Sequence, residues 1–185
     1  MAIRLKYRSP SGETRMWNLK EIIEGKPLGH PSHPLFIHFP LAFYIGVLGL
    51  DIMSKLGTFP AAPLATTWLL LGAFAGTAAA VVTGGVDWLG MRRGSMTRHK
   101  TNQHIFFQLV TAAIFIANFF IRYSDRHLAE AKPLWIVLDV IGVITLTIGQ
   151  YLGGMLVYGI GFRVGEQPPE RPKKAAATPE PPPGA

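Results

Sequence analysis

Residues 64–89 read LATTWLLLGAFAGTAAAVVTGGVDWL, and the single charged side chain in this stretch, Asp87, stands close to its end. An α-helix needs about 20 predominantly apolar residues to cross the hydrocarbon core of a bilayer. Three further apolar blocks of this kind occupy residues 35–56, 105–121 and 134–158. The sequence therefore predicts an all-α fold, a four-helix transmembrane bundle.

The connections between the blocks are short, so consecutive helices are expected to pack antiparallel in an up-down order. A polar N-terminal segment, residues 1–28, precedes the four-span membrane domain at 29–164. Within that segment, residues 16–24 either form a short amphipathic helix at the membrane interface or belong to a loosely ordered tail. Residues 165–185 are rich in Pro and Ala, which predicts a disordered C-terminal tail.

Composition supports a membrane protein. Of 185 residues, 49% are hydrophobic and 16% are charged, whereas soluble proteins carry about 25% charged residues. The net charge of +7 comes from basic residues beside the apolar blocks, where they suit lipid headgroups, so no nucleic-acid partner is expected. The chain has no Cys, which excludes disulfides, thiolate metal sites, iron–sulfur clusters and c-type haem attachment within it.

The basic residues also predict an orientation. In the up-down arrangement, 14 of the 18 Lys and Arg residues fall on one side of the membrane. The positive-inside rule then places both termini in the cytoplasm of a bacterial inner membrane. Asp87 lies at that cytoplasmic end with most of the histidines, which are His30, His33, His38, His99 and His104.

Two of these histidines suggest a cofactor. The first and third helices run parallel and lie diagonally opposite each other in such a bundle. His38 and His104 are then expected at similar depth on these two helices, in an arrangement that suits the axial ligands of a six-coordinate haem b. Arg92 and Arg93, together with Arg98, follow the second block and would pair with the haem propionates.

Other interpretations stay open for the same residues. Nitrogen and oxygen ligands for a transition metal are available from His30, His33, Asp87 and His104. A purely structural role is the remaining alternative, because His and Arg are at home in the headgroup region. At the other end of the bundle, Asp51 is expected to meet water or Lys55. Asp139 is expected to pair with Arg122 or Arg126, since a carboxylate within a span normally has a partner.

Several short motifs together resemble a known family. They are Gly29-His30-Pro31-Ser32-His33-Pro34, His38-Phe39-Pro40, Asp51, Gly85-Val86-Asp87-Trp88-Leu89, Arg93-Gly94, His104 and the closing Gly153-Gly154-x-Leu156-Val157-Tyr158-x-x-Gly161. This pattern over residues 29–164 is similar to an uncharacterised bacterial family of predicted four-span membrane proteins, domain of unknown function 2231. Gln108 departs from it, since relatives often have Asn there.

The resemblance also bears on the site. Position 38 is often not His in relatives, which favours His33, Asp87 and His104 as the shared residues. His33 would then replace His38 as the haem ligand, and Asp87 would fix the tautomer of an imidazole. We expect a redox-associated membrane subunit that passes electrons without catalysing a bond change, in contact with lipid and with a membrane protein partner or a second copy. The alternative is a non-catalytic assembly or structural subunit of a larger membrane complex.

Overall fold

The computed structural model describes residues 4–8 and 14–164, so the expected disorder of 165–185 lies outside the described residues. A short N-terminal part precedes four long helices. The elements in chain order are β1 (Arg4–Arg8), β2 (Thr14–Asn18), α1 (Leu19–Ile23), the 3-10 turn η1 (Lys26–Leu28), α2 (His33–Lys55), α3 (Ala62–Gly90), α4 (Met96–Arg122), the 3-10 turn η2 (Tyr123–Asp125), α5 (Pro133–Gly154) and the π-helical turn η3 (Met155–Gly159).

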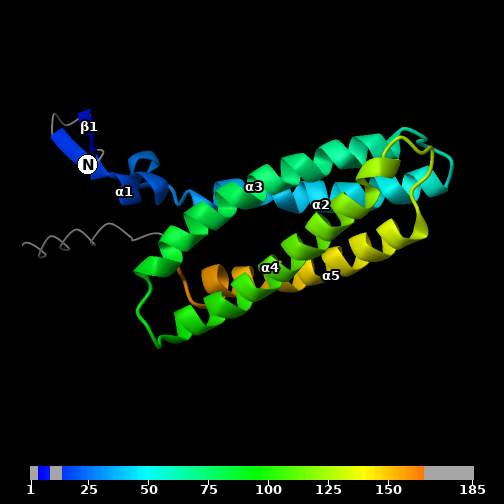
Figure 1. The fold of residues 1–185 in the computed structure, drawn as a ribbon. Helices are drawn as coiled ribbons and strands as arrows, with labels where there is room; N and C mark the ends of the chain where they lie inside the picture. Colours follow the sequence, from blue (N-terminus) through cyan, green and yellow to red (C-terminus); the bar gives the residue numbers. More distant parts are fainter. Residues whose placement is uncertain (1–3, 9–13, 165–185) are drawn as a thin grey trace, which may run out of the picture.

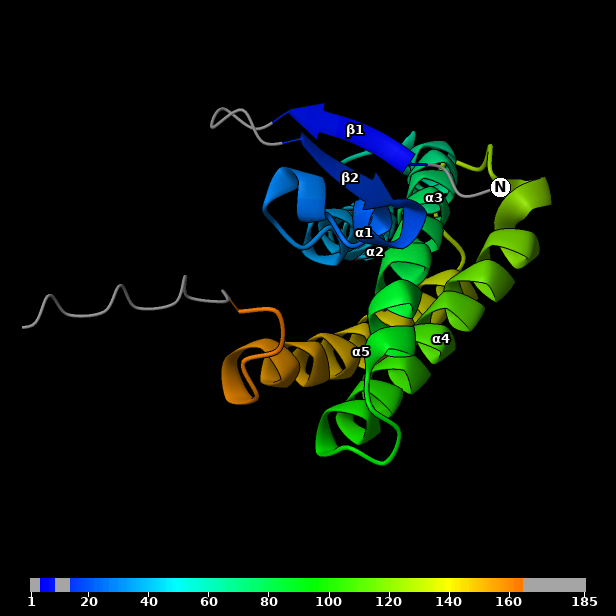
Figure 2. The same ribbon diagram turned by 90° about the vertical axis from the view of Figure 1, so that its left-hand side faces the viewer.

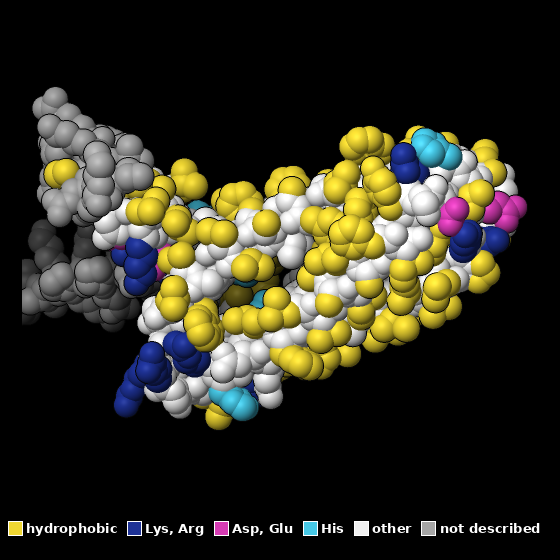
Figure 3. All heavy atoms as spheres, in the orientation of Figure 1, with side chains coloured by type: hydrophobic (Ala, Val, Ile, Leu, Met, Phe, Trp, Pro, Cys, Tyr) yellow, Lys and Arg dark blue, Asp and Glu magenta, His cyan; other side chains and the backbone are white. Residues whose placement is uncertain are grey.

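The four long helices are each long and apolar enough to cross a membrane. Large hydrophobic side chains cover their outer surface, including Phe39, Trp68, Phe120 and Tyr151 (Figure 3). A soluble bundle would present polar faces to water there, whereas this surface suits lipid tails. The predicted four-helix transmembrane bundle is thus confirmed, and lipid is in contact with its outer faces.

The bundle consists of two antiparallel hairpins, α2–α3 and α4–α5, which pack more extensively within each pair than between pairs. The hairpins diverge toward α1, and we call this the open end. It contains the first turns of α2 and α4 and the last turns of α3 and α5 (Figure 1). The hairpins converge at the opposite end, the closed end, where residues 56–61 and 123–132 connect the helices of each hairpin.

The third span begins earlier than its apolar block suggests. The Ser95 side chain accepts a hydrogen bond of 3.2 Å from the backbone N–H of Arg98 and so caps α4 at Met96. The polar stretch before Ile105 is therefore helical, because an N-cap satisfies backbone donors that the first turn leaves free. As a result, His104 lies inside a helix and does not begin one.

Side chains from α2 and α4 meet on the axis of the bundle. The rings of Tyr44 and Phe115 stack there with centroids 4.1 Å apart and planes 12° from parallel. Asp51 and Arg122 form an ion pair across the same axis and are separated by 71 positions in the sequence, as are Tyr44 and Phe115. Equivalent positions of the two hairpins therefore face each other along the bundle.

The N-terminal segment contains a β-hairpin, which was not predicted from the sequence. β1 pairs antiparallel with β2, from Arg4 opposite Asn18 to Arg8 opposite Thr14. The hairpin lies beside α1 at the open end (Figure 2). α1 is shorter than expected, because Asn18 and Glu21 form a capping box that begins the helix after β2.

Candidate site at the open end

His33 begins α2 and packs against α3. Its Nδ1 lies 3.0 Å from the carbonyl oxygen of Ala80 and 3.3 Å from the Thr83 hydroxyl. Gly84 makes this approach possible, since a Cβ there would lie 2.8 Å from the imidazole. Because a carbonyl oxygen only accepts hydrogen bonds, Nδ1 carries the hydrogen and donates it.

His104 makes matching contacts with a backbone carbonyl and a glycine in the other hairpin. Its Nδ1 donates to the carbonyl oxygen of Gly149 over 2.7 Å. The ring lies on Gly153, one turn further along α5, where a Cβ would come within 3.0 Å of it. Both imidazoles are thus held in one orientation by a backbone carbonyl and a glycine of the neighbouring helix.

Both rings keep one nitrogen available. Within residues 4–8 and 14–164, neither His33 Nε2 nor His104 Nε2 has a hydrogen-bond partner. Figure 3 shows a hollow between the hairpins toward the open end, with histidine side chains in its wall. In both rings the lone pair of Nε2 is therefore not engaged in a hydrogen bond with any described residue and is available to a ligand.

The remaining histidines do not contribute to this pair. His38 is exposed, because a helix turns by about 100° per residue and His38 therefore lies about 140° around α2 from His33. His30 is exposed in the turn before α2, with its Nδ1 2.7 Å from the Pro31 carbonyl oxygen. His99 and His127 are exposed as well. Of the two ligand pairs considered from the sequence, the geometry favours His33 with His104 and not His38 with His104.

The transition-metal interpretation does not fit the structure. Among the described residues there is no group of three or more His, Cys, Asp or Glu side chains placed to hold a metal ion. Asp87 pairs with Arg163, and His30 is exposed in the turn before α2. The set of His30, His33, Asp87 and His104 is thus not assembled as ligands.

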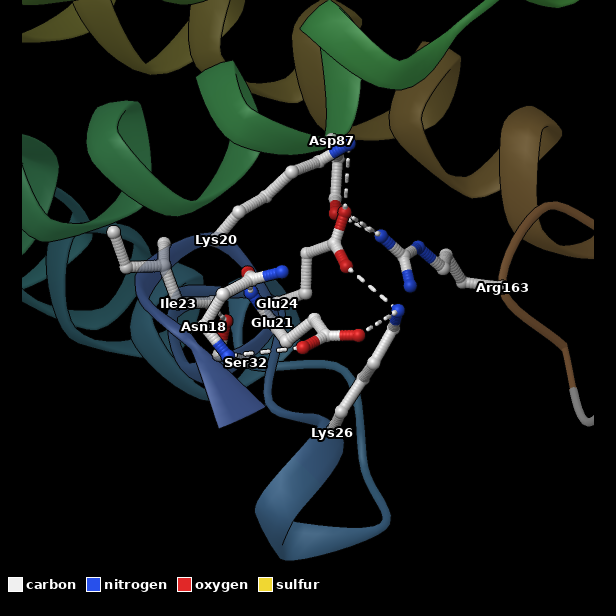
Figure 4. Close-up of polar contacts among 9 residues, drawn as sticks. All are labelled: Asn18, Lys20, Glu21, Ile23, Glu24, Lys26, Ser32, Asp87 and Arg163. Atoms are coloured by element: carbon white, nitrogen blue, oxygen red, sulfur yellow. Dashed lines mark hydrogen bonds and ion pairs between the residues drawn. The ribbon is translucent and has the colours of Figure 1, made fainter. Parts of the chain in front are cut away.

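Asp87 belongs instead to a charged cluster at the open end of the bundle (Figure 4). Its Oδ1 accepts a hydrogen bond of 2.6 Å from Arg163, whose guanidinium also lies 3.2 Å from Glu24. Glu24 lies further within 3.5 Å of the Lys26 ammonium. The cluster ties the N-terminal segment to the end of α3 and to the segment that follows η3. Asp87 therefore does not orient an imidazole, which was the role expected for it.

Glu21 stands at the edge of this cluster. Its carboxylate accepts a hydrogen bond of 3.0 Å from the backbone N–H of Asn18 and one of 3.3 Å from Lys26. The hydrogen bond from Asn18, followed by the charge of Lys26, lowers the pKa of the Glu21 carboxyl. The ionised form of Glu21 thus supports the capping box of α1.

The three arginines that follow α3 differ in whether their side chains make contacts within the protein. Arg98 donates hydrogen bonds of 3.2 Å and 3.0 Å to the carbonyl oxygens of Trp88 and Met91, and its guanidinium lies 4.0 Å from the Trp88 ring centroid. Arg92 and Arg93 are exposed. Arg98 thus fixes the α3–α4 connection, while Arg92 and Arg93 extend from it.

Comparison with known proteins agrees with the motifs in the sequence. The family described as "Predicted membrane protein (DUF2231)" matches residues 29–166, which include all four spans and both half-buried histidines. Searches of curated proteins and of solved structures found no match. The chain therefore belongs to the family of predicted membrane proteins called domain of unknown function 2231.

Proposed function

We propose that this protein binds one haem b at the open end, with His33 and His104 as axial ligands, and acts as a redox-associated membrane subunit. The observation that carries the proposal is the pair of matched imidazoles on the diagonal helices α2 and α4, each with a free Nε2. Two histidines on parallel helices of a bundle are a common way to hold a six-coordinate haem.

The hydrogen bonds of the two rings support this assignment. A histidine that ligates a metal almost always donates its other ring N–H to a carbonyl, carboxylate or water, which fixes the tautomer and makes the ligand more basic. His33 donates to Ala80 and His104 donates to Gly149. These hydrogen bonds leave Nε2 as the ligand atom in both rings, and Figure 3 shows a hollow between the hairpins toward the open end.

The surroundings suit the charged edge of a haem. Arg92 and Arg93 lie at the open end, are exposed and would pair with the propionates. By the positive-inside rule this end faces the cytoplasm of a bacterial inner membrane, with both termini on that side.

A bound haem would supply one-electron transfer. The chain itself would hold the iron through two nitrogens, keep its imidazoles in one tautomer and shield the porphyrin with apolar helices. Electrons would come from and pass to a membrane protein partner or a second copy.

The test is an absorption spectrum of the detergent-purified protein, produced in haem-sufficient cells and also titrated with haemin. We expect a Soret band that shifts on reduction by dithionite. His33→Ala and His104→Ala should each lose the six-coordinate spectrum. His38→Ala is the matched control, because His38 lies on the same helix but points outward, and it should keep the spectrum.

Size-exclusion chromatography of each variant separates loss of the ligand from loss of the fold. Monodisperse His33→Ala and His104→Ala proteins with an unchanged spectrum would overturn the ligand assignment. A monodisperse wild-type protein that stays colourless and does not bind haemin would overturn the haem proposal and would favour the assembly-subunit alternative.

A further inference from the structure

A second polar cluster lies at the closed end, far along the bundle from His33 and His104. Its members are Asp51 on α2, Asn118 and Arg122 on α4, and Asp139 on α5, and the exposed fraction of each is 0%. Arg122 Nη2 donates to Asp51 Oδ2, and Asn118 Nδ2 donates to Asp139 Oδ1 over 2.6 Å. Two carboxyl groups, one guanidinium and one amide are thus enclosed together, out of contact with solvent.

The charges of this cluster do not balance if both acids are ionised. Arg122 is the one cation among its members, and it pairs with Asp51 while its guanidinium lies 4.6 Å from the Trp135 ring centroid. The nearby lysines are engaged elsewhere, since Lys55 lies 3.0 Å from Glu130 and Lys132 lies 2.5 Å from Asp125. An uncompensated charge is very unfavourable in such a place, and a buried acid normally neutralises by taking up a proton.

The hydrogen bonds lead to the same conclusion. Three buried oxygens of the cluster have no partner among the described residues, namely Asp51 Oδ1, Asn118 Oδ1 and Asp139 Oδ2, and Arg122 Nε and Nη1 have none either. All three oxygens act only as acceptors when the acids are ionised. A proton on Asp139 Oδ2 converts one of these acceptors into a donor. One proton therefore gives the two acids a hydrogen-bond donor that they lack when both are ionised.

Of the two acids, Asp139 is the one better placed to hold the proton. Asp51 already faces the guanidinium of Arg122 directly, which favours its ionised form. Asp139 is hydrogen-bonded to a neutral amide and has no cation of its own. The amide also donates to the carbonyl oxygen of Trp135 over 3.2 Å, which fixes its orientation toward α5.

We propose that the closed end is a proton-binding site in which Asp139 carries one proton beside the Asp51–Arg122 ion pair. The ligand is a proton taken from the aqueous phase at that end, where the connections 56–61 and 123–132 lie close by. The titratable and charged groups that face Asp139 are Asp51 from α2 and Arg122 from α4. This proposal is independent of the haem, because it uses none of the residues of the open end.

Infrared spectroscopy of the detergent-purified protein at neutral pH tests it, since a protonated carboxyl has its own C=O stretching band. We expect this band in the wild-type protein and its loss in Asp139→Asn, which keeps the shape of the side chain. Arg122→Gln should enlarge the band, because both acids then become neutral. Asp125→Asn is the control, since Asp125 is an acid of the same end whose carboxylate pairs with Lys132.

Two further variants identify the carrier. Asp139→Glu should shift the band to the frequency of a glutamic acid, and Asp51→Glu should leave it in place. A wild-type protein without the band, or an unchanged band in a folded Asp139→Asn variant, would overturn the proton site. A shift in Asp51→Glu alone would overturn the assignment to Asp139. Circular dichroism of each variant verifies that the helices remain formed.

Discussion

Arg122→Gln should be among the most destabilising single substitutions in the membrane domain. Both Arg122 and its partner Asp51 are fully buried, with an exposed fraction of 0%. Removing one member of a buried ion pair forces the other to stay charged without a partner or to take up a proton, as we expect for Asp51, and typically lowers the free energy of unfolding by about 3–5 kcal/mol. Loss of the contact with the Trp135 ring acts in the same direction. At acidic pH, protonation of both carboxyls should make this loss smaller.

The assay is equilibrium unfolding in mixed micelles, driven by added sodium dodecyl sulfate and followed by circular dichroism. Lys55→Gln serves as the matched control, because the Lys55–Glu130 pair lies at the same end of the bundle with exposed fractions of 37% and 59%. A surface pair of this kind contributes about 0–1 kcal/mol. Equal loss of stability in the two variants would refute the reasoning that burial of the Asp51–Arg122 pair decides its contribution.

Two substitutions of glycine test the close helix contacts. Gly142→Ala should lower the free energy of unfolding by about 1–3 kcal/mol, measured by the same titration, because the new Cβ would lie 2.6 Å from a ring carbon of Phe115. Gly153→Ala should weaken haemin binding in a spectroscopic titration, because its Cβ would come within 3.0 Å of His104. Gly49→Ala is the control for both, since nothing lies within 4 Å of its Cβ, and losses as large in Gly49→Ala would contradict both expectations.

Hydropathy is enough to predict the four spans, because the requirement for long apolar helices in lipid is strong and local. The same apolar character conceals which face of a helix turns inward. α2 is apolar on most sides, so the sequence alone did not distinguish His38, which points outward, from His33, which packs on Gly84. The helical phase is decided by packing against α3, and that information lies in residues far away in the sequence.

The ion pairs between side chains of different helices could also not be predicted from the sequence. Asp139 was expected to pair with Arg122 or Arg126, whereas Arg122 pairs with Asp51 on the diagonal helix. The relative depth of side chains on different helices depends on how the two hairpins pack, and the sequence of one helix alone does not determine this packing. The N-terminal hairpin was missed for a different reason. Polar and apolar residues alternate in 4–8, which is typical of a strand, but residues 14–18 do not alternate and therefore give no such signal.

Equivalent positions of the two hairpins face each other, and in a single chain the two facing residues can be different. In a symmetric dimer of identical subunits, a residue on the two-fold axis faces its own copy, so an aspartate would meet an aspartate and an arginine an arginine. Covalent linkage of the halves removes that constraint. The chain can therefore keep matching imidazoles at His33 and His104, where likeness would suit the two equal ligands of the proposed haem, and place opposite charges at Asp51 and Arg122, where only unlike residues attract.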